Sequence, residues 1–480
     1  MSVSPVVVVG SPLDSTGTPL TRTPANAQSL DLRDRPGATN LADLLDGALG
    51  SVSLSNGVGN PYQSDVNYRG FQATSLLGAP VGLAVYFDGV RVNEPFGSIV
   101  NWDLIPMNAV TTVNVQPGSN PIFGLNALGG ALVVNTRNGA DLGGVRLGVL
   151  GGSFGRRAAT LEAGGADPAS HTDVFLAGNW DRQDGWRDFS GSEVKQAFGK
   201  LRWHGPGDKT VVELSGALAD TRLSGTQALP LDMLSTPKAA YTAPDAIANQ
   251  MRLVTLKASH WADDANLLIG QVYYRQSNAR SLNSNAGLDD GCFADDGSPA
   301  LTAGGAFRCG GQAPGGTALN SVTGANALAL GYGRWTSAIN TSLISSDVRQ
   351  STVGASAQWA SSAPVMDHRN AFVLGATADR SNIDYAQSTR LGRLIERQTV
   401  VSPNRIYGFT ANGLPPSPTN LPVFTGNNVL SDVDLGSRLT EASVFLTDTF
   451  DLTARLSLTL SGSYEYTAIR QDGASRQFLN

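Results

Sequence analysis

Hydrophobic and polar residues alternate one by one over much of the chain, which is the pattern of β-strands with one apolar and one polar face. In the clearest segment, Arg455 to Thr467, leucines and tyrosines occupy one face while serines, threonines and charged residues occupy the other. Such segments run for about 10 to 14 residues, close to the length of a strand that crosses a bilayer. The alternation predicts eleven strands, near residues 143–150, 155–164, 172–181, 193–204, 209–219, 249–261, 265–276, 346–360, 370–381, 438–450 and 455–468.

The connections between these strands alternate in length. After a first short link at 151–154, short links such as 205–208 and 451–454 alternate with long ones such as 277–345 and 382–437. Short turns on one side and long loops on the other are typical of an outer-membrane barrel, whose long loops face outward. A soluble sandwich would have shorter strands, and a propeller would show a four-strand repeat. Because closed bacterial barrels have an even strand number, eleven strands predict an incomplete barrel that ends on the outer side.

The first 140 residues have a different pattern, typical of a mixed α/β domain. We expect a helix over Thr39–Leu49, since Thr39 or Asn40 can cap it and its leucines share one face. Asp88-Gly89 supplies the turn of a hairpin. Short strands are predicted around residues 66–68, 81–87, 110–115 and 131–136.

The composition narrows the class of protein. The 480 residues are 41% hydrophobic and 15% charged, yet no apolar run approaches the ~20 residues of a membrane-spanning helix. The net charge of −6, without a cluster of Lys and Arg, argues against a nucleic-acid partner. The first residues have neither the basic nor the apolar region of a signal peptide, so an exported protein would have lost its signal or would begin earlier.

Two cysteines, Cys292 and Cys309, fall in one long predicted loop. A pair this close in sequence favours one disulfide in an oxidising compartment, and the alternative is two free thiols. The loop lengths place this loop on the outer side of the membrane. That side is oxidising, which agrees with a disulfide.

Motifs that could support catalysis or metal binding fail on their context. The G-x-S-x-G sequence at Gly151–Gly155 precedes a strand pattern, whereas a nucleophile elbow needs a helix there. The P-loop-like stretch 205–210 lacks the required glycines, and the four histidines have no metal-ligand spacing. The acidic pairs at 289–290 and 295–296 fit turns better than a calcium site. We therefore expect no enzyme activity, no catalytic residue, no metal site and no cofactor.

Several short motifs follow one another in the first 140 residues. They are Val6, Val7, Val8 and Val9, then Asn40–Leu45, Asn67–Phe71, Val85–Val90, Pro117–Ser119, Phe123-Gly124 and Gly129–Asn135. In order and spacing they resemble the TonB box, plug helix, R-G-F signature, Y-x-D-G-V turn and plug end of the TonB-dependent outer-membrane receptors. In that family the TonB box pairs as an added strand with the energy-transducing protein TonB.

The resemblance implies an α+β plug domain followed by an antiparallel transmembrane β-barrel, with about 11 of an expected 22 strands present and the C-terminal strands missing. It divides the chain into a TonB box with a flexible segment (1–20), a plug (21–140) and a partial barrel (141–480). It implies active import of a scarce nutrient, with a ferric siderophore as the favoured ligand. A passive porin or adhesin-like barrel is the alternative, and it would lack the plug and TonB box.

The resemblance also implies partners and a location. The partners are TonB with its inner-membrane complex, outer-membrane lipid and the small-molecule ligand. The location is the outer membrane of a Gram-negative bacterium, with plug and TonB box toward the periplasm.

Candidate site residues follow from the same resemblance. Val6 to Val9 would contact TonB. Arg69, of the R-G-F signature, is expected to anchor the plug to an inward barrel carboxylate, with Glu441 chosen over Glu213 and Glu465, and local hydrogen bonds are the alternative. The chain departs from the family at Asn114 and Gln116–Gly118, where an acidic residue and R/K-G-P often stand, which weakens the transfer of an ionic plug anchor. The plug loops 71–78 and 94–102 are expected to face the ligand through Phe71, Gln72, Phe96 and Trp102.

Overall fold

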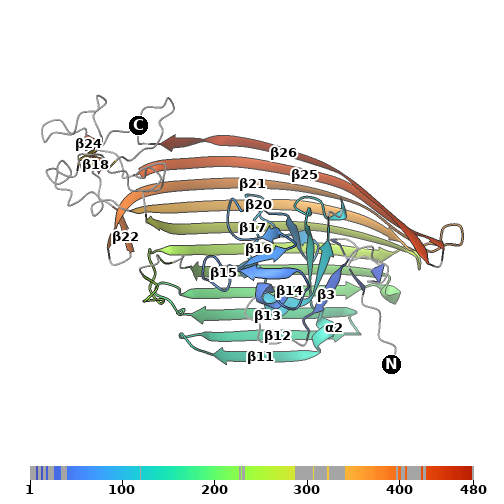
Figure 1. Ribbon diagram of the computed structural model, residues 1–480. Coiled ribbons are helices and arrows are strands. Elements are labelled where there is room, and N and C mark those ends of the chain that lie inside the picture. The colour runs from blue at the N-terminus through green and yellow to red at the C-terminus, as the bar shows by residue number, and fades with distance from the viewer. Residues whose placement is uncertain are drawn as a thin grey trace.

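In the computed structural model, a large curved β-sheet wraps around a small α+β domain, the plug (Figure 1). The structure describes residues 7–8, 12–13, 18–19, 26–33, 41–79, 81–118, 121–225, 229, 233–286, 306–307, 322–323, 341–395, 398–401, 406–407, 423–424, 429–453 and 455–477. The N-terminal and plug elements are β1 (Val7–Val8), β2 (Thr18–Pro19), β3 (Gln28–Asp31), α1 (Leu41–Leu45), β4 (Val52–Ser55), β5 (Asp65–Tyr68), β6 (Phe71–Ala73), β7 (Leu83–Phe87), β8 (Val90–Arg91), η2 (Trp102–Leu104), η3 (Met107–Ala109), β9 (Val110–Pro117), η4 (Pro121–Phe123), β10 (Gly130–Thr136) and α2 (Gly139–Leu142). The elements that follow are β11 (Gly144–Gly151), β12 (Arg157–Asp167), β13 (Thr172–Gln183), β14 (Ser192–His204), η5 (Pro206–Asp208), β15 (Thr210–Ser224), β16 (Asp245–Trp261), β17 (Asn266–Ala286), β18 (Ala306–Phe307), β19 (Val322–Thr323), β20 (Thr341–Ser361), β21 (Asn370–Ile395), β22 (Gln398–Val401), β23 (Ile406–Tyr407), β24 (Val423–Phe424), β25 (Val429–Thr453) and β26 (Leu456–Gln477).

The large sheet is antiparallel, and its strands follow chain order as β11-β12-β13-β14-β15-β16-β17-β20-β21-β25-β26, with β22 paired to β21 off this path. This confirms the eleven predicted barrel strands. The register is continuous over long stretches; β16 and β17, for example, pair from Asp245↔Asn283 to Trp261↔Leu267. Over the described residues the sheet is open, with β11 and β26 as its edges (Figure 1).

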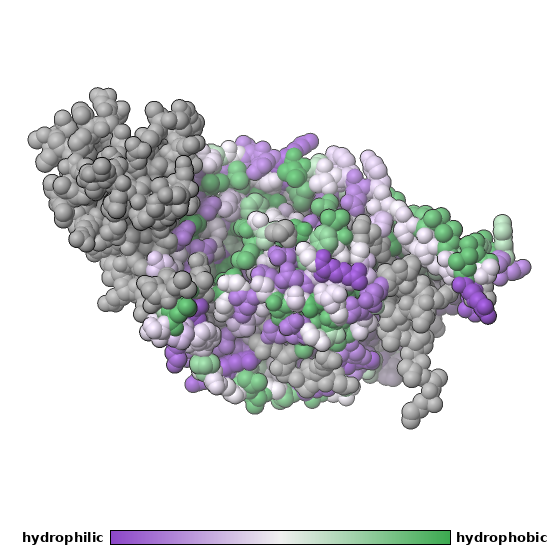
Figure 2. Space-filling view, viewed as in Figure 1, coloured by the Kyte–Doolittle hydropathy of each residue, from purple (hydrophilic) through white to green (hydrophobic). Residues whose placement is uncertain are grey.

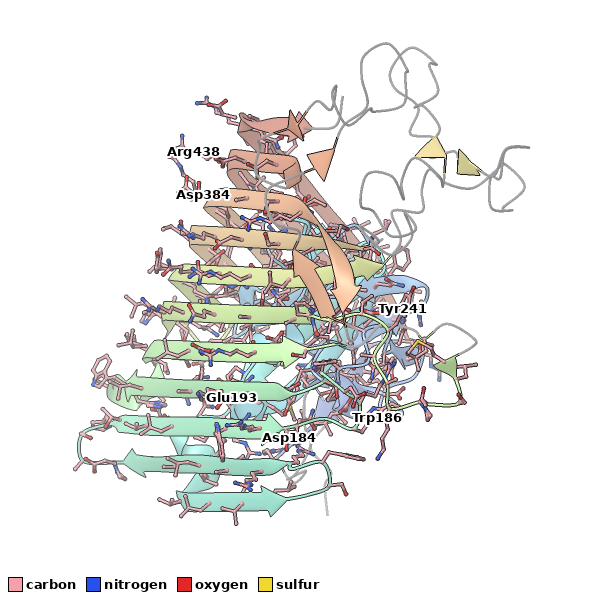
Figure 3. The ribbon with its side chains drawn as sticks, turned by 90° about the vertical axis from the view of Figure 1, so that its left-hand side faces the viewer. Asp184, Trp186, Glu193, Tyr241, Asp384 and Arg438 are labelled. Atoms are coloured by element: carbon pink, nitrogen blue, oxygen red, sulfur yellow. The ribbon has the colours of Figure 1, made fainter. Side chains whose placement is uncertain are left out.

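The later strands are longer than the alternation predicts. β21 has 26 residues and β25 has 25. Their additional residues lie toward the end with the long connections, where polar side chains such as Asp384 and Arg438 occupy the convex face (Figure 3). The hydrogen-bond ladder therefore continues beyond the point where the contrast between apolar and polar faces ends.

The convex face carries an apolar belt. Exposed, outward-facing members are Leu147, Leu161, Leu176, Leu201, Leu214, Leu256, Val272, Val353, Leu374, Val444 and Leu460. Aromatic side chains bound this belt toward the short turns: Trp203 is exposed, and Trp359 meets Phe372 with ring centroids 5.2 Å apart. An apolar belt bordered by aromatic residues matches the lipid-facing wall of a barrel.

The plug lies against the concave face, and its visible surface mixes hydrophilic and hydrophobic residues (Figure 2). Its main sheet has the order β3-β9-β10-β7-β8, with β10 parallel to β7 and the other pairs antiparallel. The predicted β7–β8 hairpin is present, and its turn residues Asp88 and Gly89 adopt φ of 45° and 88°, which favours this dipeptide. The plug core continues into the barrel wall, where Phe87 meets Phe198 edge-on.

The predicted plug helix is shorter than expected. α1 covers only Leu41–Leu45, because Gly47 adopts φ of 68°, a left-handed conformation that ends helices. Residues 39 and 40, the proposed caps, lie outside the described residues. In the part of the chain that the structure describes, we find no helix with the length and hydropathy needed to cross a membrane.

The convex belt yields a first prediction. Leu256 pairs with Leu214 on one side and Val272 on the other. We expect Leu256→Arg to reduce the free energy of folding into lipid vesicles by about 2–4 kcal/mol, because its charge would enter the hydrocarbon region. Lys257→Arg is the matched control, since Lys257 lies on the opposite face of the same strand. Equal stability of the two variants would show that this face does not contact lipid.

Candidate functional site

A cavity of about 630 Å³ lies between the plug and the inner face of the sheet, at the end of the long connections. We call it the apical pocket. Plug loops around residues 57–63, 75–77 and 94–101 form one side, and the ends of β16, β17 and β20 form the other. Small-molecule sites commonly have volumes of about 300–1,000 Å³. The apical pocket is therefore the candidate ligand site.

Glu94 lies at the floor of this pocket and is almost completely buried. Its Oε1 accepts hydrogen bonds from Arg275 Nη2 at 2.5 Å and from Asn101 Nδ2 at 3.2 Å. Its Oε2 accepts from Ser277 Oγ at 2.6 Å and from Gln350 Nε2 at 3.1 Å. We call this set the Glu94 network. Because three of its four donors belong to β17 and β20, it joins the plug to the barrel wall.

Phe96 connects the lining of the apical pocket to this network. Its backbone N–H donates to Gln350 Oε1 at 2.7 Å, so Gln350 bridges Phe96 and Glu94. The Phe96 ring stacks on Tyr385 of β21, with centroids 4.7 Å apart and an interplanar angle of 27°. A molecule that displaced Phe96 would therefore disturb Gln350 and, through it, Glu94.

Asp103 of η2 makes a second polar link to the wall. Its Oδ2 accepts from Thr221 Oγ1 at 2.5 Å and from Asn249 Nδ2 at 3.0 Å, and its backbone oxygen accepts from Gln196 Nε2 at 2.6 Å. Its Oδ1 has no hydrogen-bond partner among the described residues. Burial raises the pKa of the Asp103 carboxyl, and the bonds from Thr221 and Asn249 only partly oppose this.

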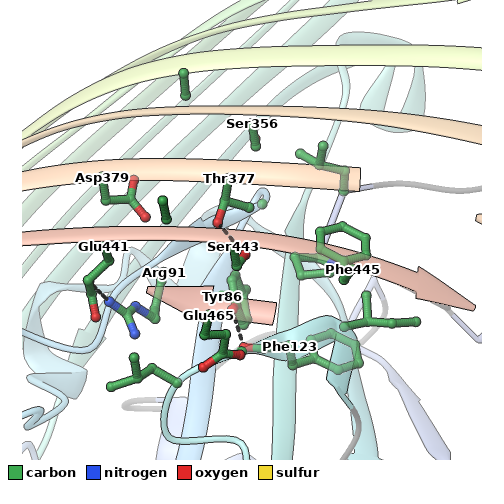
Figure 4. Close-up of a pocket in the computed structure, with 18 of the residues that line it drawn as sticks. Tyr86, Arg91, Phe123, Ser356, Thr377, Asp379, Glu441, Ser443, Phe445 and Glu465 are labelled. Carbon is green, nitrogen blue, oxygen red and sulfur yellow. Dashed lines mark hydrogen bonds and ion pairs between the residues drawn. The ribbon is translucent and has the colours of Figure 1, made fainter. Parts of the chain in front are cut away.

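Charge pairs form a third link, on the side of the short turns. Arg91 of β8 pairs with Glu441 of β25, and Asp379 and Glu465 line the same small cavity of about 70 Å³ (Figure 4). Tyr273 donates to Asp379 Oδ1 at 2.6 Å. One plug cation thus lies among three barrel carboxylates.

The β7–β8 turn supplies a further ionic contact. Asp88 lies 3.3 Å from Lys200 Nζ of β14. The same carboxylate accepts hydrogen bonds from the backbone and hydroxyl of Thr136, at 2.9 and 2.6 Å. The hairpin turn is therefore attached both to the plug sheet and to the barrel.

The anchoring residues differ in part from the expectation. Glu441 does contact the plug, but its partner is Arg91 and not Arg69. Arg69 occupies the β5–β6 turn with φ of 52°, where its side chain is exposed and stacks over the Tyr68 ring at 5.2 Å. Within the described chain no ion pair of Arg69 occurs. In the sequence, the feature that could have identified Arg91 is its position in the predicted hairpin, where it pairs across from Tyr86.

Of the four expected ligand-facing residues, Phe96 lines the apical pocket. Trp102 is buried and donates from Nε1 to the Ala73 oxygen at 3.1 Å, so it supports the loops from below. The Phe71 ring packs so closely on Gly82 and Gly129 that neither glycine could carry a Cβ.

Gln72, the fourth of these residues, bridges to Val81 through its backbone and does not line the apical pocket. Ser75, Leu76 and Leu77 of the same predicted loop line the pocket instead. Alternation and motifs located the correct loop, but which of its residues face the cavity depends on how the loop packs.

Two other sets of predicted residues are only partly described. Val7 and Val8 form β1, which pairs with β2 as Val7↔Pro19 and Val8↔Thr18, while Val6 and Val9 lie outside the described residues. Cys292 and Cys309 also lie outside them, so the disulfide stays a prediction.

We compared the chain with known protein families and with curated protein sequences. Residues 19–131 match the family model described as the TonB-dependent Receptor Plug Domain. A search of curated protein sequences gave no significant match.

Solved structures resemble the chain over almost its whole length. The ferric citrate transporter FecA, in its unliganded form, has a TM-score of 0.64 and 15% identity, covering 98% of this chain and 60% of its own. The ferric-catecholate import receptor Fiu from E. coli K12 has a TM-score of 0.63 and 14% identity, covering 98% and 64%. The ferric preacinetobactin receptor BauA from Acinetobacter baumannii has a TM-score of 0.61 and 14% identity, covering 98% and 62%. The chain thus spans about 60% of the length of these structures.

The fold and the plug–wall contacts define a plugged outer-membrane β-barrel, represented here by its plug and eleven wall strands. Residues 19–131 match the plug domain of TonB-dependent receptors, and the described chain has the fold of these outer-membrane receptors, as the sequence motifs predicted. Such receptors are transporters and not enzymes.

The Glu94 network yields a second prediction. Arg275→Met leaves the Glu94 carboxylate buried without its cation, and we expect a loss of about 3–5 kcal/mol in the free energy of unfolding. Adding Glu94→Gln should recover most of this loss. Arg280→Met is the control, because that arginine is 70% exposed on the same strand and its pair with Asp347 is worth at most about 1 kcal/mol. Urea unfolding in micelles measures all three; equal losses for Arg275→Met and Arg280→Met would contradict the network's role.

The raised pKa of Asp103 yields a third prediction. Between the ordinary aspartate value, about 3.9, and the raised one, the native state holds a proton that the unfolded chain has released. The free energy of unfolding therefore falls as pH rises through this window. Asp103→Asn should remove this dependence while keeping an acceptor for Thr221 and Asn249. Asp103→Ala should cost about 1–3 kcal/mol at every pH, because both donors lose their acceptor.

Urea unfolding at a series of pH values above 4 measures both variants. An unchanged pH profile in Asp103→Asn would exclude Asp103 as the source of the dependence.

Proposed function

We propose that this receptor actively imports a ferric siderophore, which binds in the apical pocket and is released inward when TonB loosens the plug. The observation that carries the proposal is the Glu94 network, which places a plug residue of the pocket floor in direct contact with two barrel strands. A ligand seated there contacts the plug and the wall at once. The names of the similar structures (ferric citrate, ferric-catecholate and ferric preacinetobactin receptors) support ferric siderophores as the ligand class.

The coupling begins at Phe96 in this proposal. A bound ligand displaces its loop, which removes the N–H donor from Gln350 and weakens one of the four bonds to Glu94. Each such bond to a charged group is worth about 1.5–3 kcal/mol. Ligand binding thus lowers the free energy needed to separate plug and wall.

TonB acts at the other end of the plug in this proposal. Val6 to Val9 pair with TonB as an added strand, with the periplasm on the side of the short turns. Leu13, a few residues further along, is buried in the small cavity that Arg91 and Glu441 line. Tension on the N-terminal segment therefore reaches the Arg91–Glu441 pair before the Glu94 network.

A passive porin is the competing function, and the packing disfavours it. The plug core is continuous with inward side chains of the wall, including Phe175 and Phe198. A passive pore needs a water-filled lumen, whereas this half of the wall is covered by packed plug residues.

Uptake of radioactive ferric siderophores by cells that carry this receptor alone tests the proposal. Deletion of residues 5–10 should abolish uptake while binding at the cell surface persists. Val8→Pro should act like the deletion, because proline removes a backbone N–H donor, while Val8→Ala, the matched control, should keep most of the uptake. Uptake that survived the deletion would contradict energy coupling through this segment.

A further inference from the structure

The charge of the apical pocket bears on which ligand it accepts. Among the 25 described residues that line it, none is lysine, arginine or histidine, and the carboxylates are Glu94 and Asp245. Glu94 is compensated within its network. Asp245 is buried and accepts a hydrogen bond from the Ser284 backbone at 3.1 Å. The described lining therefore offers no cation to an anionic ligand.

Three arginines at this end of the barrel have partners elsewhere. Arg275 lies under the floor, bound to Glu94. At the same end of the barrel, Arg156 pairs with Asp181 at 2.7 Å, and Arg187 donates to the Ala239 oxygen at 2.8 Å. None of the three lines the pocket.

The two sides of the pocket differ in chemistry. The wall side presents amides and hydroxyls from inward positions of β17 and β20, including Ser281, Asn283 and Ser346. The plug side presents the apolar Leu76, Leu77 and Phe96 beside the polar Gln63 and Ser75. Such a pocket suits a molecule with one hydrogen-bonding face and one apolar face.

Charge then decides between classes of ferric chelate. Burying an anionic group without a cation costs several kcal/mol, whereas neutral carbonyl groups can be satisfied by amides and hydroxyls. Three hydroxamates each carry one negative charge and together neutralise Fe³⁺, while three catecholates leave an excess of three negative charges. Ferric complexes of citrate are also anionic.

We infer that the apical pocket selects an electrically neutral ferric hydroxamate over anionic catecholate or citrate chelates. This inference rests on the proposed import of a ferric siderophore and adds its chemical class. The hydroxamate carbonyl and ligand amide groups face β17 and β20, and the apolar part of the ligand faces Leu76 and Phe96.

Binding to the full receptor in outer-membrane vesicles tests the inference. The probes are ferrichrome as a neutral trihydroxamate, ferric enterobactin as an anionic catecholate, and ferric dicitrate. We expect ferrichrome to bind at least about tenfold more tightly than either anion, a difference of about 1.4 kcal/mol. Tighter binding of either anion would overturn the inference while leaving the siderophore function intact. Binding of none of the three would contradict the proposed function, and the inference would fall with it.

A substitution that adds a positive charge to the apical pocket tests whether this cavity determines the selectivity. Ser346→Arg places a cation in the pocket and should tighten binding of ferric enterobactin about tenfold or more, without tightening that of ferrichrome. Ser345→Arg is the matched control, because Ser345 lies on the opposite face of β20 and should change neither affinity. Asn283→Arg, on β17, repeats the test should Ser346→Arg fail to fold. Unchanged enterobactin affinity in a folded pocket variant would overturn the assignment of this cavity.

Discussion

Backbone hydrogen bonding in a medium without water is the constraint on which this structure depends. Every N–H and C=O of a strand that crosses lipid needs a partner in the neighbouring strand. The eleven strands satisfy it by pairing antiparallel in chain order, over registers as long as Asn266↔Ser361 to Ala286↔Thr341. Because side chains alternate across such a wall, one face must be apolar and the other is free to be polar.

The mixed inner face of the wall determines how the plug is held. Apolar residues such as Phe175 and Phe198 alternate there with polar and charged ones, so the plug combines apolar packing with buried polar links. Glu94, Asp103, Asp88 and Arg91 make these links, spread from the apical pocket to the side of the short turns. Such contacts are strong while complete and costly when one partner is lost, which agrees with the proposed release of the plug.

The apical pocket and the plug attachment share residues. Glu94 is both the floor of the pocket and the centre of a bonded network, and Gln350 connects it to the loop of Phe96. Arg275 pairs with Glu94 beneath the floor and does not line the pocket, so it offers no charge to a ligand there. The neutral lining of the described pocket thus follows from the way in which the plug is anchored.

The sequence alone determined the strands of the wall and the type of the plug domain. Period-two alternation, link lengths and the order of the plug motifs depend on local patterns, so they predicted eleven strands, their sides and the Asp88-Gly89 hairpin. Tertiary structure decided which side chains meet. Arg69 and Arg91 are both plug arginines near turns, but only packing places Arg91 at Glu441 and leaves Arg69 exposed. Trp102 and Phe96 lie in one predicted loop, yet one is buried and the other lines the pocket, because the loop folds back on Ala73. Contacts between residues more than a hundred positions apart leave no mark in a local pattern, and the Glu94 network consists largely of such contacts.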